Sequence, residues 1–506
     1  MEEIKQIKQK WYQNKYTWIF IIILLAAIGL RFYYYTITEN QPLWWDESDY
    51  MSAAKTYAGH GFADLTGQRL PGLPLLASLL FQTGMQNEAL IRFCICFIPS
   101  IIMLILLYLA ISKMYADKRI ALISMAIMAF LTESLFYSNR FQTENLGLIF
   151  QFLSIIFMYS FLNKKNAFYL VLTGAMALLS VFFRPGQMLF IPAMVLFLII
   201  TQWKEHKIIV TSLIALMVLA ATGIMMYVPS LNYIIMSNMN ASNIGPAWNS
   251  LTVFNGLLGN VFSIFLYIGI VITLFTFRKE KSDIFNLLTI ITVLSAFIFV
   301  IRAPAYEYRW FFPLIIAALV LTAKCMITLI DGSLSLLFKS PAKAASIAVI
   351  ILLLIFGVYS QIATATMLIN IKANTYADVR SAGLWIKDNS AKNDVIFSIS
   401  YPQTAYYSER KVMSYAELNN SAQFDDFIIQ NNPRWFTVSI YEPHPLWIYE
   451  WLDKNQPLVF PAAAYFTDAA QTKAALIIYG FRGDPRNWAT AENNSNISCT
   501  EDSCAA

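Results

Sequence analysis

Long apolar segments recur along most of this chain. Apolar side chains make up 58 % of the 506 residues and charged side chains only 13 %, whereas soluble domains carry about 25 % charged residues. A helix needs about 20 apolar residues to cross a bilayer. The sequence therefore predicts a polytopic α-helical membrane protein with eleven spans, at 17–36, 90–112, 119–137, 144–162, 167–183, 186–202, 207–228, 255–277, 284–301, 310–331 and 344–366.

Two short sequences refine this topology. The apolar stretch from Phe168 to Thr201 is too long for one crossing at about 1.5 Å per residue. Pro185 and Gly186 interrupt a helix and Arg184 resists burial in lipid, so two spans are predicted. The segment LPGLPLLASLLF, which follows the first span, is too short to cross and predicts an interfacial or re-entrant helix.

Basic residues in the connections predict the orientation. Alternate connections and the N-terminal tail hold sixteen Lys and Arg residues, whereas the opposite connections hold six. The basic side is expected to be cytoplasmic. The first segment has no clear cleavage site and is interpreted as a retained span. We therefore expect a multi-pass protein of the cell membrane with a cytoplasmic N-terminus and residues 367–506 on the opposite, outer side. Because the basic residues follow the membrane, no nucleic-acid partner is predicted.

The composition changes near Thr375, which predicts a second domain. The expected division is a transmembrane domain over 1–366, with a first outer loop over about 37–89, and an extracytoplasmic α/β domain over 367–506. Short apolar runs predict four strands and amphipathic spacing predicts two helices, with sequences VIFSIS, KVMSY, FTVSI and ALIIYG for the strands and YADVRSAGLWIKDN and FDDFIIQ for the helices. Whether Cys499 and Cys504 form a disulfide is left open.

Charged side chains gather on the predicted outer side. Ionisable residues near lipid are costly and indicate a functional cavity. Guanidinium groups bind phosphate with two donors, and a carboxylate can remove a proton from an attacking hydroxyl or amine. Such groups at a lipid–water boundary favour transfer of a group from a lipid phosphate. The candidates are the acids Asp46, Glu47 and Glu144 and the arginines Arg184, Arg309, Arg140 and Arg302.

Structural interpretations of the same residues stay open. Asp46 fits the N-cap of a helix running to Gly59, with Asp49 at the N3 position. Glu47 and Glu144 fit compensation of a helix dipole. Arg140, Arg302 and Arg69 fit anchors at the membrane edge. Arg184 and Arg309 fit this interpretation less well, because both adjoin long apolar runs. The joint placement of these groups on one side favours a site.

The order of several motifs resembles the GT-C superfamily of membrane glycosyltransferases. The group most similar contains the protein O-mannosyltransferases and the lipid A aminoarabinose transferase, on the motifs WWDESDYMSAAKTY, LPGLPLL, SNRFQTENLGLIFQFLSI, SVFFRPGQMLFIPA and YRWFFPLIIAALVL. The resemblance implies an inverting transferase that uses a polyprenyl-phosphate sugar. It implies that Asp46 acts as or near the base and that Glu144 neighbours it. It also implies that Arg184 and Arg309 hold the donor phosphate, with Arg92 as a weaker match.

The sequence also departs from this group. Glu144 stands where the aminoarabinose transferase has Asp, and the MIR domain of the mannosyltransferases is absent. The Trp-Trp-Asp here lies in the first loop, unlike the motif of oligosaccharyltransferase. No cofactor is expected to be required, although a divalent cation stays open.

The expected partners are membrane lipids, the polyprenyl-phosphate sugar donor and a protein, lipid or glycan acceptor. The rival interpretations are an oligosaccharyltransferase-type enzyme that uses lipid pyrophosphate, and a non-enzymatic transporter or flippase of lipid-linked sugars.

Overall fold

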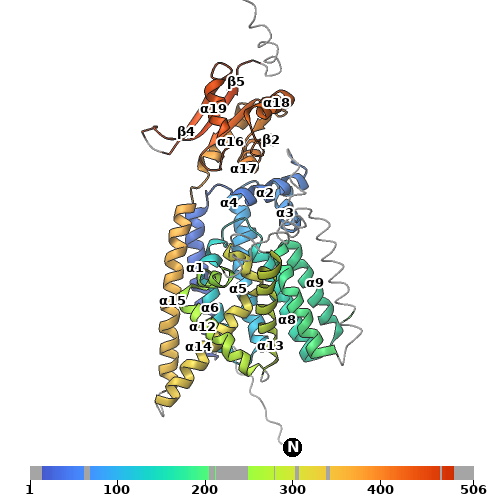
Figure 1. Ribbon diagram of the computed structural model, residues 1–506. Coiled ribbons are helices and arrows are strands. Elements are labelled where there is room, and N and C mark those ends of the chain that lie inside the picture. The colour runs from blue at the N-terminus through green and yellow to red at the C-terminus, as the bar shows by residue number, and fades with distance from the viewer. Residues whose placement is uncertain are drawn as a thin grey trace, which may run out of the picture. The chain divides into compact units, whose positions relative to one another are not determined.

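The structure, a computed structural model, divides into two compact units (Figure 1). The chain passes from one unit to the other after Asn40, after Thr66 and after Ala373. We call them the helical unit and the α/β unit. The residues that the structure describes are 14–61, 69–203, 211, 249–277, 280–301, 307–337, 342–467 and 470–483.

In its described part, the helical unit contains helices and no strands. Residues 191–203 are also helical. Its elements are α1 (Lys15–Thr38), α3 (Gly72–Gln82), α4 (Glu88–Arg92), the π-helix η2 (Phe93–Phe97), α5 (Ile98–Met114), α6 (Lys118–Phe130), α7 (Thr132–Phe136), α8 (Glu144–Lys164), α9 (Ala167–Phe183), the 3-10 helix η3 (Pro185–Phe190), α12 (Asn249–Thr276), α13 (Lys281–Ala296), the π-helix η5 (Phe297–Ile301), the 3-10 helix η6 (Tyr308–Leu314), α14 (Ile315–Leu337) and α15 (Ala342–Lys372).

The polytopic fold class is confirmed. Eight of the expected spans coincide with helices long and apolar enough to cross a membrane in the described part of the chain. The expected span over 167–183 is α9, a shorter apolar helix of 17 residues. The expected span over 207–228 falls outside the described residues. The short helix expected from LPGLPLLASLLF is α3, which has 11 residues.

The single helix expected over 119–137 is wrong, because the chain breaks into α6 and α7. Leu131 lies between them in an extended conformation, with φ −60° and ψ 138°. Two buried side chains satisfy the backbone groups that the break releases. Arg31 of α1 donates to the Ala129 carbonyl at 2.8 Å, and the amide oxygen of Gln361 in α15 accepts from the Thr132 N–H at 2.9 Å. A buried break needs such partners.

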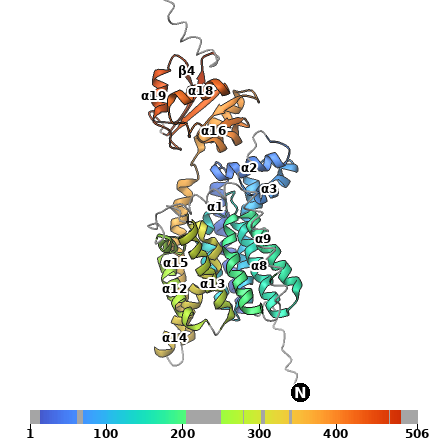
Figure 2. The ribbon, with the colours of Figure 1, turned by 45° about the vertical axis from the view of Figure 1, so that its right-hand side comes forward.

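The break predicted at Pro185 is confirmed. α9 ends at Phe183, Arg184 is extended, and η3 begins at Pro185. α8 and α9 lie side by side and antiparallel (Figures 1 and 2). The start of α8 and the end of α9 therefore meet at one end of the helical unit. The basic connection between the two helices, with Lys164 and Lys165, lies at the other end.

The α/β unit contains a five-stranded mixed sheet of order β2-β1-β3-β5-β4. β1 pairs in parallel with β2 and β3, whereas β5 pairs antiparallel with β3 and β4. The elements of this unit are α2 (Trp45–Tyr57), α16 (Ala377–Asp388), β1 (Val395–Phe397), α17 (Tyr401–Ser408), β2 (Lys411–Met413), α18 (Ser421–Asn431), β3 (Trp435–Ser439), α19 (Trp447–Lys454), β4 (Val459–Phe466) and β5 (Ala474–Phe481).

Helices cover both faces of this sheet, so its central strand is apolar throughout. All five residues of β3 are buried, as expected for a strand covered on both sides. Alternate side chains enter two cores. Trp435 packs with α16 residues on one face, and Phe436 packs with α18 and α19 residues on the other.

The four expected strands and two expected helices of this domain are present. Sequence patterns did not predict β4, α17 or α19. β4 holds Pro461 and three consecutive alanines, which have low strand propensity. Proline is tolerated there because β4 is an edge strand. α19 is amphipathic but only 8 residues long.

The first-loop helix α2 belongs to the α/β unit by its contacts, and it packs on α17. The sequence-based division placed this loop with the transmembrane domain and started the soluble domain at residue 367. α15 instead continues to Lys372. The sequence spacing that positions Asp46 near the first span does not reveal this packing, because α17 lies more than 340 residues later.

We predict that Gln361→Leu destabilises the helical unit. The substitution leaves the buried Thr132 N–H without its acceptor, which costs about 1–3 kcal/mol. Thermal unfolding of the purified protein in detergent is the measurement. Ser360→Ala, in the neighbouring position of α15, is the control, because the Ser360 hydroxyl bonds only within its own helix at the Gly357 carbonyl. Equal melting temperatures for the two variants would contradict the role of Gln361.

Candidate functional site

Two arginines share one carboxylate oxygen at the start of α8. Oε1 of Glu144 forms ion pairs with Nη1 of Arg184 and with Nη1 of Arg309, the latter at 3.3 Å. Glu144 is 1 % exposed. Arg184 also donates from Nη2 to the Arg309 carbonyl at 2.7 Å. The structure thus brings together Glu144, Arg184 and Arg309, three residues predicted from sequence positions far apart in the chain.

Local structure explains why these three side chains meet. Glu144 is in the first turn of α8, where the helix dipole favours a negative charge. Arg184 occupies the extended residue between α9 and η3. Arg309 is in η6, which precedes α14. Gly147 permits the approach, because a Cβ atom there would lie 2.9 Å from Cβ of Arg184.

Aromatic rings and a second acid surround the guanidinium groups. The guanidinium carbon of Arg309 lies 5.4 Å from the ring centre of Tyr137, and that of Arg184 lies 5.8 Å from the ring centre of Phe312. Both distances fit cation–π interactions. The exposed Glu307 accepts from Nε of Arg309. The cluster therefore combines a buried anchor, Glu144, with an acid that solvent can reach.

Three polar residues of this cluster were not predicted. Gln142 accepts from Nη1 of Arg309 at 3.2 Å. The buried Glu133 of α7 interacts electrostatically with Glu144 and Arg309. Gln187 is fully buried and its Cγ would lie 3.3 Å from a Cβ on Gly147. Glu133 lay inside an expected span, and a neutral Gln gives no charge signal, so only the fold identifies them.

Several buried polar atoms of the cluster make no hydrogen bond with the described residues. They are Oε2 of Glu144, Nε of Arg184, and both side-chain polar atoms of Gln187. Buried polar groups nearly always have partners, and an exception calls for a ligand or water. These atoms lie on residues that contact one another near the start of α8.

Two of the other predicted arginines bind backbone carbonyls. Arg140 donates to the Lys372 carbonyl at 3.2 Å, at the end of α15. Arg92 donates to the Glu39 carbonyl at 2.5 Å, just beyond α1. Both side chains are buried. Arg302 lies outside the described residues. For these three, a contact with the donor phosphate stays a prediction.

Asp46 and Glu47 occupy the first turn of α2 in the α/β unit. The interpretation of Asp46 as an N-cap is wrong, because Trp44 is the N-cap residue. Glu47, at the N3 position, is the capping acid. Its Oε2 accepts from the Trp44 N–H at 2.7 Å, and its side chain is buried. Asp46 is partly exposed. Its approach to Glu144 stays a prediction.

This arrangement can bind an anion next to apolar helices. Glu144 holds two guanidinium groups together, and guanidinium groups are suited to phosphate oxygens. Among the described residues, no three His, Cys, Asp or Glu side chains are grouped as metal ligands. Independence from a divalent cation stays a prediction.

We predict that Gly147→Ala displaces Arg184 from Glu144. The added methyl group would overlap the Arg184 side chain, and such overpacking costs about 1–3 kcal/mol. The melting temperature of the purified variant is the measurement. Gly186→Ala is the matched control, because a Cβ there meets only Nε of Arg184, at an ordinary 3.8 Å. A melting temperature for Gly147→Ala equal to that of the control would mean that the close approach is not required.

Comparisons with known proteins agree with these observations. The family model for dolichyl-phosphate-mannose-protein mannosyltransferases matches residues 68–233. A search of curated proteins found no match.

Among solved structures, the oligosaccharyltransferase AglB of Archaeoglobus fulgidus, in complex with an inhibitory peptide and a dolichol-phosphate, has a TM-score of 0.58 at 12 % identity. That alignment covers 94 % of this chain and 75 % of the other. ArnT from Cupriavidus metallidurans, bound to undecaprenyl phosphate, has a TM-score of 0.57 at 11 % identity and covers 92 % of this chain and 98 % of its own.

At these identities the structural similarity establishes the fold, and the family match covers the region from α3 past the α8–α9 pair. The resemblance stated from the sequence motifs is confirmed. The chain has the fold of the GT-C membrane glycosyltransferases and resembles, within them, the group that contains the protein mannosyltransferases and ArnT.

Proposed function

We propose that this chain is an inverting glycosyltransferase that moves a sugar from a polyprenyl-phosphate donor to a protein, lipid or glycan acceptor. The observation that carries the proposal is the pairing of Arg184 and Arg309 on the buried Glu144, with polar atoms of Glu144, Arg184 and Gln187 that lack partners among the described residues. The similar AglB and ArnT structures contain dolichol-phosphate and undecaprenyl phosphate, which supports a lipid phosphate as the ligand.

In this proposal the arginine pair binds the donor phosphate. Both guanidinium groups stay ionised and present several N–H donors. Arg309 exchanges its exposed partner Glu307 for a phosphate oxygen, whereas Glu144 stays in place beneath the pair. The buried amide of Gln187 supplies a further polar contact for the phosphate or sugar.

Glu144 is then a positioning residue. Two like charges at one place repel each other, and a shared carboxylate removes this cost before the donor arrives. Such preorganisation is effective in catalysis because the dipoles and charges need no rearrangement as the leaving group gains charge. Because Glu144 is buried, its interactions with the arginines are stronger than they would be in water.

Asp46 is proposed as the general base. The acceptor oxygen or nitrogen attacks the anomeric carbon as the bond from that carbon to the phosphate oxygen breaks. The proton of the acceptor passes to Asp46, and the polyprenyl phosphate leaves with the electron pair of the broken bond. Direct displacement inverts the anomeric centre. Asp46 is preferred to Glu47 because the Glu47 carboxylate caps α2.

The proposed orientation places this reaction on the outer face of the cell membrane. The arginine cluster lies at the end of α8 and α9 opposite the basic Lys164–Lys165 connection. Basic connections remain on the cytoplasmic side. The N-terminus is then cytoplasmic and the α/β domain is extracytoplasmic.

We predict that Asp46→Asn loses sugar transfer by about 10²–10⁴-fold, the usual contribution of a general base, and retains donor affinity. Transfer of a radiolabelled sugar from polyprenyl phosphate by the reconstituted protein is the measurement. Normal turnover of Asp46→Asn would remove Asp46 from the base role. Labelled sugar that crosses the bilayer without reaching an acceptor would instead indicate a flippase.

A second prediction separates the two kinds of arginine. Arg309→Ala removes a charged contact to the phosphate, worth about 1.5–3 kcal/mol, so donor affinity falls about 10–100-fold. Arg119→Ala is the matched control, because its guanidinium pairs with Asp117 and Asp331 instead. Binding of undecaprenyl phosphate to each purified variant is the measurement. Equal losses in both variants would contradict the assignment of the phosphate to the Glu144 cluster.

An oligosaccharyltransferase-type enzyme is the second candidate, because two structures of an archaeal oligosaccharyltransferase match this fold with TM-scores of 0.58. The discriminating experiment removes divalent cations. Under our proposal, transfer continues in excess chelator. Complete loss in chelator, restored by Mg²⁺ or Mn²⁺, would favour the pyrophosphate-using enzyme.

A further inference from the structure

The segment around Asp46 is fixed to the α/β unit by contacts with α17. The Leu43 N–H donates to the hydroxyl oxygen of Tyr407 at 2.8 Å. The ring of Trp45 meets that of Tyr401 edge-on, with centroids 5.1 Å apart. These contacts lie three residues and one residue from Asp46, so they bear directly on where its carboxylate points.

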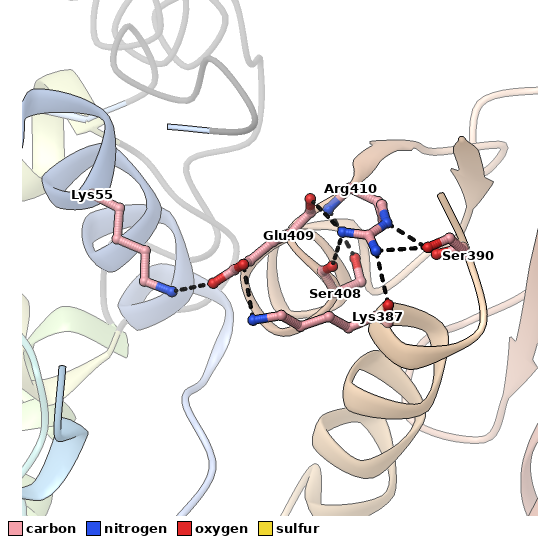
Figure 3. Close-up of polar contacts among 6 residues, drawn as sticks. All are labelled: Lys55, Lys387, Ser390, Ser408, Glu409 and Arg410. Atoms are coloured by element: carbon pink, nitrogen blue, oxygen red, sulfur yellow. Dashed lines mark hydrogen bonds and ion pairs between the residues drawn. The ribbon is translucent and has the colours of Figure 1, made fainter. Parts of the chain in front are cut away.

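A third contact fixes the other end of α2 (Figure 3). Nζ of Lys55 lies 3.1 Å from Oε1 of Glu409, directly after α17, and 4.3 Å from the ring centre of Tyr406. Oε2 of Glu409 pairs with Nζ of Lys387 in α16 at 2.8 Å. Burial alone would raise the pKa of Glu409, but Lys387 and Lys55 lower it below its usual value. The carboxylate is therefore ionised at neutral pH.

α17 itself is held firmly within the α/β unit. The buried Arg410 donates to the carbonyls of Lys387 and Ser390 after α16, both at 2.8 Å, and to the carbonyl of Ser408 at 3.1 Å (Figure 3). A positive charge at the C-terminal ends of helices is favourable. α16 and α17 also pack closely, because a Cβ on Gly383 would lie 2.6 Å from Cβ of Tyr407.

We propose that the α/β domain positions the catalytic base: α17, through Tyr401, Tyr407 and the Glu409–Lys55 ion pair, fixes α2 and thereby Asp46. This inference rests on the proposed function of Asp46. Tyr401, Tyr407, Lys55 and Glu409 are positioning residues, since they act through α2. The extracytoplasmic domain is then part of the catalytic machinery in addition to any role in acceptor choice.

The chemistry explains why such fixation matters. A base must lie within hydrogen-bond reach of the proton that it removes, and a misplacement of about 1 Å can cost about 100-fold in rate. α2 has 13 residues, and isolated helices of this length are marginal in water. Contacts at both of its ends hold it in one place.

The test compares two lysines that share one carboxylate. Lys55→Met removes the contact between α2 and Glu409, whereas Lys387→Met removes the other partner of Glu409 and keeps the Lys55–Glu409 contact. We expect Lys55→Met to speed amide hydrogen exchange in 45–57 about tenfold, from loss of the ion pair and the Tyr406 contact. We expect kcat to fall about tenfold with the donor KM within about twofold. Lys387→Met should match the wild type.

Tyr407→Phe is the second variant, because it removes the acceptor of the Leu43 N–H and keeps the aromatic ring. It should raise exchange in α2 and lower kcat in the same way. Rescue provides a readout that general destabilisation would not give. In the Lys387→Met background, Lys55→Glu and Glu409→Lys should each lower kcat, and the two together should restore it by re-forming the pair in reverse.

The outcomes separate this inference from the proposed function. Unchanged exchange in both Lys55→Met and Tyr407→Phe would overturn the docking of α2. Faster exchange with unchanged kcat, beside an inactive Asp46→Asn, would overturn only the positioning role. A fully active Asp46→Asn would remove the base itself, whatever exchange shows.

Discussion

The ion pairs of Glu144 with Arg184 and Arg309 are the constraint on which the site depends. Buried charges are expensive to remove from water, and a buried salt bridge is weak evidence for stability. Here one carboxylate oxygen serves two guanidinium groups and leaves polar atoms of the cluster without partners among the described residues. Such a cluster costs stability and is best explained by a ligand that completes it. The rest of the fold must offset this loss of stability.

In this fold, regular helices end at the positions of the charged groups. α9 ends before Arg184 because Pro185 cannot continue the helix. Similarly, α6 ends before the segment that contains Glu133 and Tyr137. The released backbone groups of that second break are bound by Arg31 and by Gln361. Helix ends are unfavourable in an apolar bundle because of their unpaired backbone groups. Here they form one polar site.

Sequence reasoning predicted the parts of this design that charge and hydropathy express. The apolar helices, the break at Pro185, and the charged residues Glu144, Arg184 and Arg309 follow from the cost of burying a charge or a proline. The break at Leu131 did not follow, because nothing in that apolar run marks it and its partners come from α1 and α15. Gln187 carries no charge, so its place in the cluster was invisible until the fold placed it beside Arg184.

The packing of α2 on α17 escaped prediction for a different reason. Sequence proximity joined Asp46 to the first span, but the contacts of Leu43, Trp45 and Lys55 with α17 join it to the α/β domain. If the arginine cluster binds the donor and Asp46 removes the proton, the two steps are organised by separate packing units. Substitutions in α17 then act on the proton-transfer step, whereas substitutions around Glu144 act on donor binding. A rate that depends on both units requires acceptor, base and donor to come together, which limits wasteful loss of the sugar to water.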